Sequence, residues 1–236
     1  MNYFNIMKKI LNNLHFQVLK LLLIAFAQLP LYAQIPSGYI GKPFSDDTLG
    51  FKGPQVIPGR IELAYYDFGG EGVAYHDSTA NNDGAILNHK CFDYGCHWRP
   101  GVPYHIAFFR ENEGVDISYT KDWADYKKPN VVEPMVNQLY IGWEANGEWT
   151  NYTVDVKSPG RYKIITVYAN YDNNSELWLN NMFATKLYLP KNTGYYHQWD
   201  QSTIGEIEFP AAGIQLITLK YNRGPNLAYL DFVKIN

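Results

Sequence analysis

The chain has 236 residues, of which 18% are charged and 16% aromatic, and its formal net charge is −3. A surface of this sign makes nucleic acid and anionic membranes poor partners. The first 33 residues have the pattern of a secretory signal: basic residues, an apolar run over 21–27, and Ala33 at the expected cleavage position. We therefore expect an exported, periplasmic or extracellular protein with no stable membrane insertion. Because no cysteine lies near the cleavage position, we expect no lipid anchor.

The part after this leader has 203 residues and a net charge of −6, because the leader contains three lysines and no acid. This length is enough for one well-filled core. Residues 34–56 are rich in glycine and proline and are expected to form an extended lead-in. Residues 57–236 are expected to form one domain, with an irregular insertion around 85–136.

Short apolar or alternating segments follow one another through this domain, separated by turn residues. The expected strands are residues 61–67, 108–109, 115–117, 139–141, 151–156, 162–169, 176–179, 182–189, 202–209, 214–221 and 228–235. In residues 151–156, Tyr152, Val154 and Val156 alternate with polar residues, as in a half-buried strand. No segment after the leader shows a helical period. The pattern predicts an all-β fold, an antiparallel β-sandwich or barrel.

The two cysteines, Cys91 and Cys96, lie five residues apart within the insertion. In an exported protein this pattern predicts a local disulfide. His89 and His97 flank the pair, so a zinc site is an alternative. However, the spacing matches no familiar zinc motif, and oxidised thiols do not ligate zinc.

Several carboxylates in the expected loops could carry acid–base chemistry. They are Glu71, Asp77, Glu111, Glu113, Asp116, Glu144 and Glu148. A glycosidase needs two carboxylates facing each other about 5–10 Å apart. No nucleophile elbow, zinc-protease motif or phosphate-binding loop accompanies these acids. We expect most of them to be solvated.

Aromatic residues at the ends of loops are a sharper signal. Trp143 and Tyr196 each lie next to or near a glycine, which lets a ring stand clear of the backbone. Trp199 precedes a strand and is expected in the core. An exposed ring at the end of a sandwich is either a lid on the core or a platform for a ligand. Sugar rings stack on such platforms through their apolar faces.

Five stretches in this order resemble a family 6 carbohydrate-binding module: residues 61–77, 113–120, 141–154, 193–199 and 224–232. The likeness is strongest to exported, elongated versions attached to polysaccharide-degrading enzymes. It implies a β-jelly-roll with a binding cleft in the loops at one end. By motif position, Trp143 and Tyr196 would stack on a sugar and Asn226 would hydrogen-bond to it. A rim residue would come from the first long loop, which offers Tyr75, His76 and Asp77.

The sequence departs from the family pattern at the opening Glu-Ala-Glu motif, whose carboxylates hold a structural calcium in the family. Here the motif reads Glu62-Leu63-Ala64, so one carboxylate is missing. Glu62 and Asp231 remain as calcium ligands. A site that needs six to eight oxygens is thereby weakened.

The resemblance implies non-catalytic binding of a polysaccharide or oligosaccharide, with a polysaccharide-degrading enzyme as a partner. One alternative is a glycoside hydrolase or lyase on a jelly-roll scaffold, which would use acids of the insertion. A second alternative is an adhesive protein whose aromatic residues contact another protein. We favour the binding module, because the sequence contains no catalytic motif.

Overall fold

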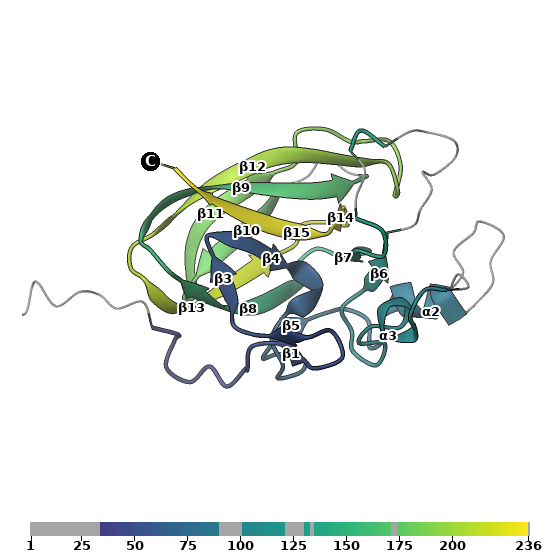
Figure 1. Ribbon diagram of the computed structural model, residues 1–236, viewed down its shortest axis with the longest axis horizontal. Coiled ribbons are helices and arrows are strands. Elements are labelled where there is room, and N and C mark those ends of the chain that lie inside the picture. Colours follow the sequence, from purple (N-terminus) through teal and green to yellow (C-terminus); the bar gives the residue numbers. More distant parts are fainter. Residues whose placement is uncertain (1–33, 90–100, 121–129, 133–134, 171–173, 236) are drawn as a thin grey trace, which may run out of the picture. The chain divides into compact units, whose positions relative to one another are not determined.

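The computed structural model describes residues 34–89, 101–120, 130–132, 135–170 and 174–235. In this part of the chain two main β-sheets enclose a core (Figure 1). The first sheet has the order β11 (Met182–Tyr188), β10 (Asn174–Leu179), β13 (Gly213–Lys220), β8 (Trp149–Val156), β3 (Gln55–Ile57), with β5 (Tyr75–His76) paired to β8. The second has the order β4 (Gly59–Glu62), β15 (Tyr229–Lys234), β9 (Gly160–Ala169), β14 (Asn226–Leu227), β7 (Leu139–Ile141), β6 (Ile117–Tyr119), with β12 (Trp199–Phe209) paired to β9. A small hairpin joins β1 (Ser45–Asp46) and β2 (Phe51–Lys52).

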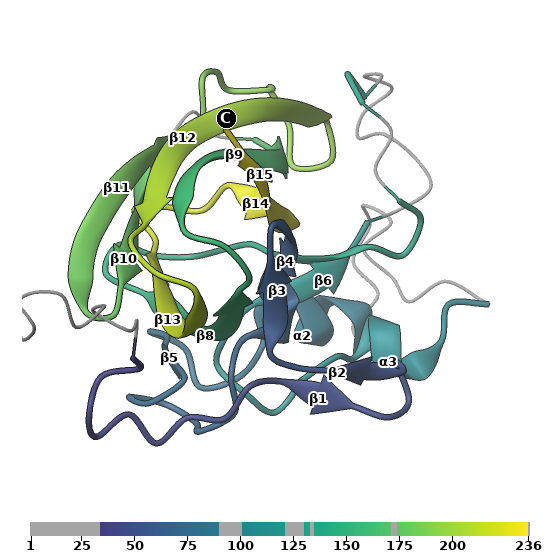
Figure 2. The ribbon, with the colours of Figure 1, turned by 60° about the vertical axis from the view of Figure 1, so that its left-hand side comes forward.

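The strand order is that of a jelly-roll sandwich. From β8 onward the chain passes repeatedly between the sheets: β8, β10, β11 and β13 belong to the first, and β9, β12, β14 and β15 to the second (Figure 2). Among the described pairs, β3 with β8 is parallel and the others are antiparallel. The predicted antiparallel β-sandwich is therefore confirmed.

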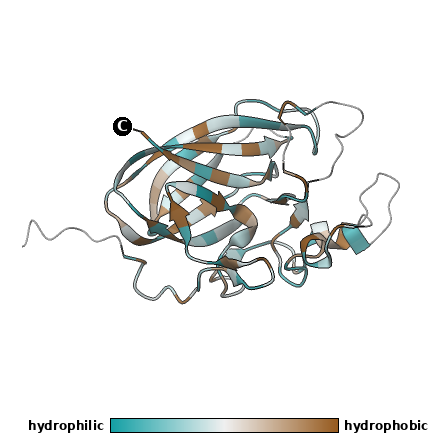
Figure 3. Ribbon diagram, viewed as in Figure 1, coloured by the Kyte–Doolittle hydropathy of each residue, from teal (hydrophilic) through white to brown (hydrophobic). Residues whose placement is uncertain are grey.

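Residues of opposite polarity alternate along the long strands (Figure 3). Tyr152, Val154 and Val156 are buried in the core, as the alternation of β8 predicts. A second, smaller apolar cluster contains Tyr140 and Trp199. Trp199 is completely buried, so its expected place in the core is confirmed.

The other face of β8 is also buried, through polar contacts. Asp67 accepts hydrogen bonds from the backbone N–H of Thr153 at 2.8 Å and from its hydroxyl at 2.6 Å. Asp67 also contacts the lead-in of residues 34–56, because the Tyr39 hydroxyl donates a hydrogen bond to Asp67 Oδ2 at 2.7 Å. Burial raises the pKa of Asp67, and the bonds from Thr153 and Tyr39 oppose that rise. The lead-in thus covers β8 and takes part in its hydrogen bonding.

The expectation that no helix follows the leader is wrong in two short segments, α2 (Asp83–His89) and α3 (Tyr104–Ala107). Both lie beside β6 (Figure 1). Asn82 Oδ1 accepts hydrogen bonds from the N–H groups of Ala85 and Ile117, at 3.0 and 2.9 Å. This side chain caps the start of α2 and ties it to β6. A helix therefore starts at Asp83, within a polar stretch that shows no helical period in the sequence.

Some strand boundaries also differ from the prediction. The strand expected over 61–67 ends at Glu62, because Leu63–Tyr65 forms a 3₁₀ turn. Residues 108–109 follow α3 and are not in a strand, and the strand expected over 115–117 lies at Ile117–Tyr119. Within the described ranges, no helix has the length and apolar character needed to cross a membrane.

Cys91, Cys96 and His97 lie outside the described residues, so the disulfide stays a prediction. His89, the flanking residue that the structure does describe, ends α2. Its Nε2 atom lies 2.7 Å from Glu111 Oε2.

The two remaining calcium candidates lie on neighbouring strands. Glu62 is on β4, and Asp231 on β15 is paired with Arg60. Glu62 Oε2 accepts a hydrogen bond from Gln138 Nε2 at 2.6 Å, and Arg60 NH1 lies 4.0 Å from Glu62 Oε1. A guanidinium therefore supplies positive charge beside these acids, where calcium would need further oxygens. These residues do not fit a calcium ion, and no metal-binding group of three or more His, Cys, Asp or Glu side chains occurs in the described part.

Calcium addition followed by chelation should leave the melting temperature unchanged, because no ion is expected to bind the folded state at Glu62 and Asp231. Thermal unfolding with and without chelator checks this. A drop in melting temperature on chelation that disappears in Glu62→Gln would place calcium at this pair and contradict the expectation.

Asp67→Ala should lower the free energy of unfolding by about 3 kcal/mol, because it leaves the Thr153 N–H and two hydroxyls without their acceptor. Tyr39→Phe removes one of these donors and should cost about 1 kcal/mol. Urea unfolding measures both. Asp155→Ala is the control, since Asp155 is a half-buried acid of β8 paired with Lys157 at the surface, and should cost less than about 1 kcal/mol. Equal costs for Asp67→Ala and Asp155→Ala would show that the Asp67 contacts do not stabilise the fold.

Candidate functional site

Trp143 lies two residues after the end of β7 and displays its side chain at the surface. Its backbone φ of 63° lies in the left-handed region, which bulky residues rarely adopt and which costs of order 1 kcal/mol. The side chain is 41% exposed. Its ring lies nearly parallel to that of buried Tyr140, with the centroids 6.4 Å apart and an interplanar angle of 15°. Trp143 is therefore a supported ring with an exposed face, which favours a platform over a lid on the core.

Tyr196 lies in the connection between β11 and β12. It is 48% exposed, and its ring meets that of Tyr195 edge-on at 5.8 Å. The next residue, His197, lies 3.3 Å from the hydroxyl of Tyr140, measured from its Nε2 atom. The loop that carries Tyr196 thus also contacts the ring that supports Trp143.

Asn226 connects the segments that carry these two aromatic residues. It begins β14 and is 3% exposed. Its Nδ2 donates a hydrogen bond to the carbonyl of Tyr196 at 2.6 Å. Its Oδ1 lies so close to Gly142 that a Cβ added there would collide with it. The structure therefore brings Trp143, Tyr196 and Asn226 into one region, with Asn226 buried between the other two segments.

The turn after Trp143 packs on the chain that leads to Asn226. A Cβ added at Gly224 would lie 3.4–3.5 Å from backbone atoms of Trp143 and Glu144. Two backbone hydrogen bonds continue the contact, from Gly147 N–H to the Tyr221 carbonyl and from Tyr221 N–H to the Glu148 carbonyl. The turn of residues 143–148, which we call the Trp143 turn, is thus held against residues 221–226.

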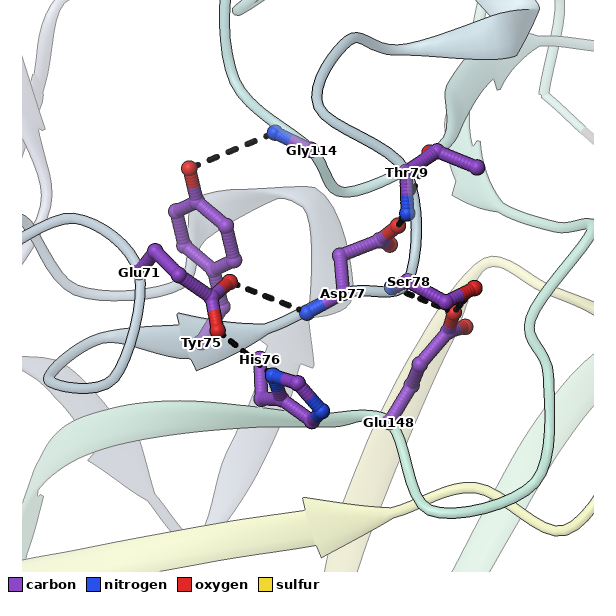
Figure 4. A network of polar contacts seen from close by, with 8 residues as sticks. All are labelled: Glu71, Tyr75, His76, Asp77, Ser78, Thr79, Gly114 and Glu148. Atoms are coloured by element: carbon purple, nitrogen blue, oxygen red, sulfur yellow. Dashed lines mark hydrogen bonds and ion pairs between the residues drawn. The ribbon is translucent and has the colours of Figure 1, made fainter.

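The three rim candidates of the first loop have different surroundings (Figure 4). Tyr75 is buried, and its hydroxyl accepts a hydrogen bond from the Gly114 N–H at 3.3 Å. His76 is exposed and paired with Glu71, with 2.5 Å between Nδ1 and Oε1, and this contact raises the pKa of His76. Asp77 accepts hydrogen bonds from the N–H and hydroxyl of the neighbouring Thr79. Of the three, His76 and Asp77 reach the surface, whereas Tyr75 packs inside.

Glu148 joins this first loop to the Trp143 turn (Figure 4). Its Oε1 accepts hydrogen bonds from the N–H and hydroxyl of Ser78, at 2.8 and 2.5 Å. Its Oε2 accepts one from the Ala145 N–H at 2.6 Å. One carboxylate therefore fixes both segments relative to each other.

The expectation that the loop acids are mostly solvated is wrong for Asp116, Glu144 and Glu148, which are buried. Burial raises the pKa of Asp116 to about 8 and that of Asp77 to about 6. Burial also raises the pKa of Glu144 well above its usual range. Asp116 lies in a segment of apolar residues, and this pattern was the available sign of its burial. Nothing comparable marks Glu144 in the sequence.

A second aromatic surface lies on the first sheet. Its hollow has a volume of about 300 Å³, and its lining combines aromatic and polar side chains: Trp149, Asn151, Trp178, Asn181, Thr218 and Lys220. Lys220 Nζ lies 3.7 Å from the ring centroid of Trp178. We call this feature the sheet hollow. It is a competing location for any ligand that stacks on aromatic rings.

Sequence reasoning did not identify the residues that support the candidate site. Tyr140 is the main example, because it looked like one more apolar residue of an expected strand. The alternation of β7 was the available signal. Leu139 and Ile141 belong to the main core, whereas Tyr140 belongs to the smaller cluster on the other face.

Comparison with known proteins finds similarity among solved structures. No family model matches the chain, and no curated protein matches it. CsCBM6-3 from Clostridium stercorarium, in complex with cellobiose, is 14% identical over 78% of this chain and 100% of its own, with a TM-score of 0.42. A module of lichenase 5A from Cellvibrio mixtus, in complex with cellotriose, is 19% identical over 52% of this chain and 88% of its own, with a TM-score of 0.39.

A third similar structure is a cycloisomaltooligosaccharide glucanotransferase from Paenibacillus sp., complexed with cycloisomaltoheptaose. It is 16% identical with a TM-score of 0.37, and the match covers 49% of this chain but 16% of the enzyme. All three are distant likenesses. The chain is thus similar to structures that include family 6 carbohydrate-binding modules, the family that its motifs resemble.

Proposed function

We propose that this protein binds a polysaccharide or oligosaccharide without catalysis, through Trp143 and Tyr196. One observation carries the proposal: two exposed aromatic side chains from distant parts of the sequence are tied together by the buried amide of Asn226. An aromatic ring held in a strained backbone conformation is a recurrent feature of binding sites. The support of Trp143 by Tyr140 further fixes the platform.

The chemistry of such a site suits a sugar. The apolar face of a pyranose stacks on an aromatic ring, and its hydroxyls need polar groups at the rim. Exposed His76 and half-buried Asp77 are the polar groups of the first loop that we propose for the rim. Two stacked rings and a few hydrogen bonds of about 1 kcal/mol each leave a modest surplus after the cost of association. We expect a binding free energy of about −4 to −6 kcal/mol.

The enzyme alternative requires two facing carboxylates open to a substrate. Asp116 and Glu144 are buried instead, and Glu148 is engaged by Ser78 and Ala145. These contacts favour a structural role for the acids.

Release of reducing sugar from a polysaccharide panel would support the enzyme instead. Competition by free oligosaccharide separates sugar binding from adhesion to a protein. We propose a polysaccharide-degrading enzyme as the partner beside which such a module would act.

Trp143→Ala and Tyr196→Ala should each weaken oligosaccharide binding by more than about tenfold, because each removes a stacking face. Cellobiose and cellotriose, named for two similar structures, are convenient first probes in calorimetric titration. The free energy of unfolding of Trp143→Ala should fall by less than about 1.5 kcal/mol, against about 3–5 kcal/mol for a tryptophan of the core.

Trp178→Ala is the matched control, because it removes a partly exposed tryptophan from the sheet hollow and should leave binding unchanged. Loss of binding in Trp178→Ala with retention in Trp143→Ala would move the site to the sheet hollow. A strongly destabilised Trp143→Ala that still binds sugar would show that Trp143 closes the core instead.

Gly142→Ala should also weaken binding, by about tenfold or more. Its Cβ would displace the Asn226 amide, and with it the hydrogen bond to the Tyr196 carbonyl. Titration with the same sugar measures the effect. Gly147→Ala serves as the control, because space around Gly147 is open although its φ is 97°. It introduces backbone strain in the same turn without touching Asn226. Equal binding by wild type and Gly142→Ala would contradict the assigned role of Asn226.

A further inference from the structure

The Trp143 turn encloses a carboxyl group that has no partner. The side chain of Glu144 is 5% exposed. Neither of its oxygens accepts a hydrogen bond from another residue in the described part of the chain. No basic side chain among the described residues forms an ion pair with it. A buried carboxylate in this position would be costly, since it lacks both a donor and a counter-charge.

The groups that face Glu144 are acids and phenols. Glu148 of the same turn acts on it, as do Asp116 and Asp77 from two neighbouring segments, and each opposes its ionisation. Tyr152 of β8 and Tyr221 also face it, and the proximity of Glu144 contributes to their raised pKa values. The surroundings therefore add repulsion to the penalty of burial.

The other three acids differ from Glu144 in having donors. Asp116 Oδ1 accepts from the Asp83 N–H at 2.6 Å, Glu148 accepts from Ser78 and Ala145, and Asp77 accepts from Thr79. A buried carboxyl group can be neutralised by a cation, by hydrogen-bond donors or by a proton. The described residues offer Glu144 neither of the first two, which leaves the proton.

We propose that Glu144 is a neutral carboxylic acid in the folded protein and that its ionisation at higher pH loosens the Trp143 turn. Glu144 is then a positioning residue for the ring of Trp143. The link is direct, because the two residues are adjacent and the backbone of both lies 3.4–3.5 Å from where a Cβ at Gly224 would be. An ionised Glu144 must reach water, and it can do so only by moving this packed turn. The part of the proposal that concerns sugar rests on the function proposed above.

The direction of the pH dependence follows from proton linkage. Below the usual glutamate pKa, Glu144 is protonated in both the folded and the unfolded chain. Above it the folded protein keeps a proton that the unfolded chain has lost, so stability falls as pH rises toward the raised pKa. Asp77 and Asp116 titrate in the same direction. The informative quantity is therefore the difference between wild type and Glu144→Gln.

The test is urea unfolding of the whole protein from pH 5 upward, to the pH at which the difference between wild type and Glu144→Gln stops changing. Relative to Glu144→Gln, the folding equilibrium constant of wild type should fall by about tenfold per pH unit until the pH reaches the raised pKa of Glu144, the change expected for one linked proton. Glu208→Gln is the control, because Glu208 is exposed on β12, and it should run parallel to wild type. A Glu144→Gln curve parallel to wild type would overturn the proposal.

Sugar binding provides a second readout. Above the raised pKa of Glu144, where the unfolding difference between the two proteins levels off, wild-type affinity for cellotriose should fall by at least severalfold, whereas the affinity of Glu144→Gln should not change with pH. If wild type binds no sugar at pH 5, the proposed function fails and the unfolding data still decide the state of Glu144. If the unfolding difference levels off but wild-type sugar affinity does not fall above that pH, the positioning role is overturned.

A third measurement covers the case in which Glu144→Gln does not fold. Wild-type protein labelled with ¹³C at glutamate carboxyl groups reports protonation directly by NMR. One glutamate should remain protonated at pH 7, and ionisation of every glutamate at that pH would overturn the proposal.

Discussion

The amide of Asn226 is the contact on which the candidate site depends. One side of the amide donates to the loop before β12, and the other lies against the backbone at the end of β7. β14 consists of two residues and lies between β9 and β7 in the second sheet. Its other residue, Leu227, is buried in the main core. The strand places a single polar side chain between two loops, beside the contact of His197 with Tyr140.

The fold was predictable because its signal is local. A period of two along β8 and a short apolar run in β9 identify strands whatever their partners are, and an antiparallel sandwich follows from many short strands. The helices α2 and α3 were missed because tertiary contacts create them. Asn82 reaches across to Ile117, and the sequence near residue 82 does not contain that information. A polar run suits a surface loop and a capped helix start equally well.

The candidate site was less predictable from the sequence than the fold. The positions of Trp143, Tyr196 and Asn226 came from ordered motifs, and the structure adds that Asn226 acts between two segments. The burial of Glu144 was beyond sequence reasoning, because it depends on four separate segments packing around one side chain. Charged residues next to glycine and asparagine usually lie in water. Here the Trp143 turn buries Glu144, and the surroundings of this side chain disfavour the ionised form that glutamate usually takes.

The contact between Tyr39 and Asp67 bears on where the folded unit begins. Residues 34–56 have the composition of a linker, yet β3 pairs with β8 at their end and Tyr39 reaches the buried acid beneath. The segment is thus an outer layer over β8, an inner strand of the first sheet. Trimming the protein at residue 57 would expose Asp67 and Thr153 to solvent and leave β8 with a free edge over residues 154–156. Such an edge is a template for pairing with another chain, so the shortened protein would tend to self-associate.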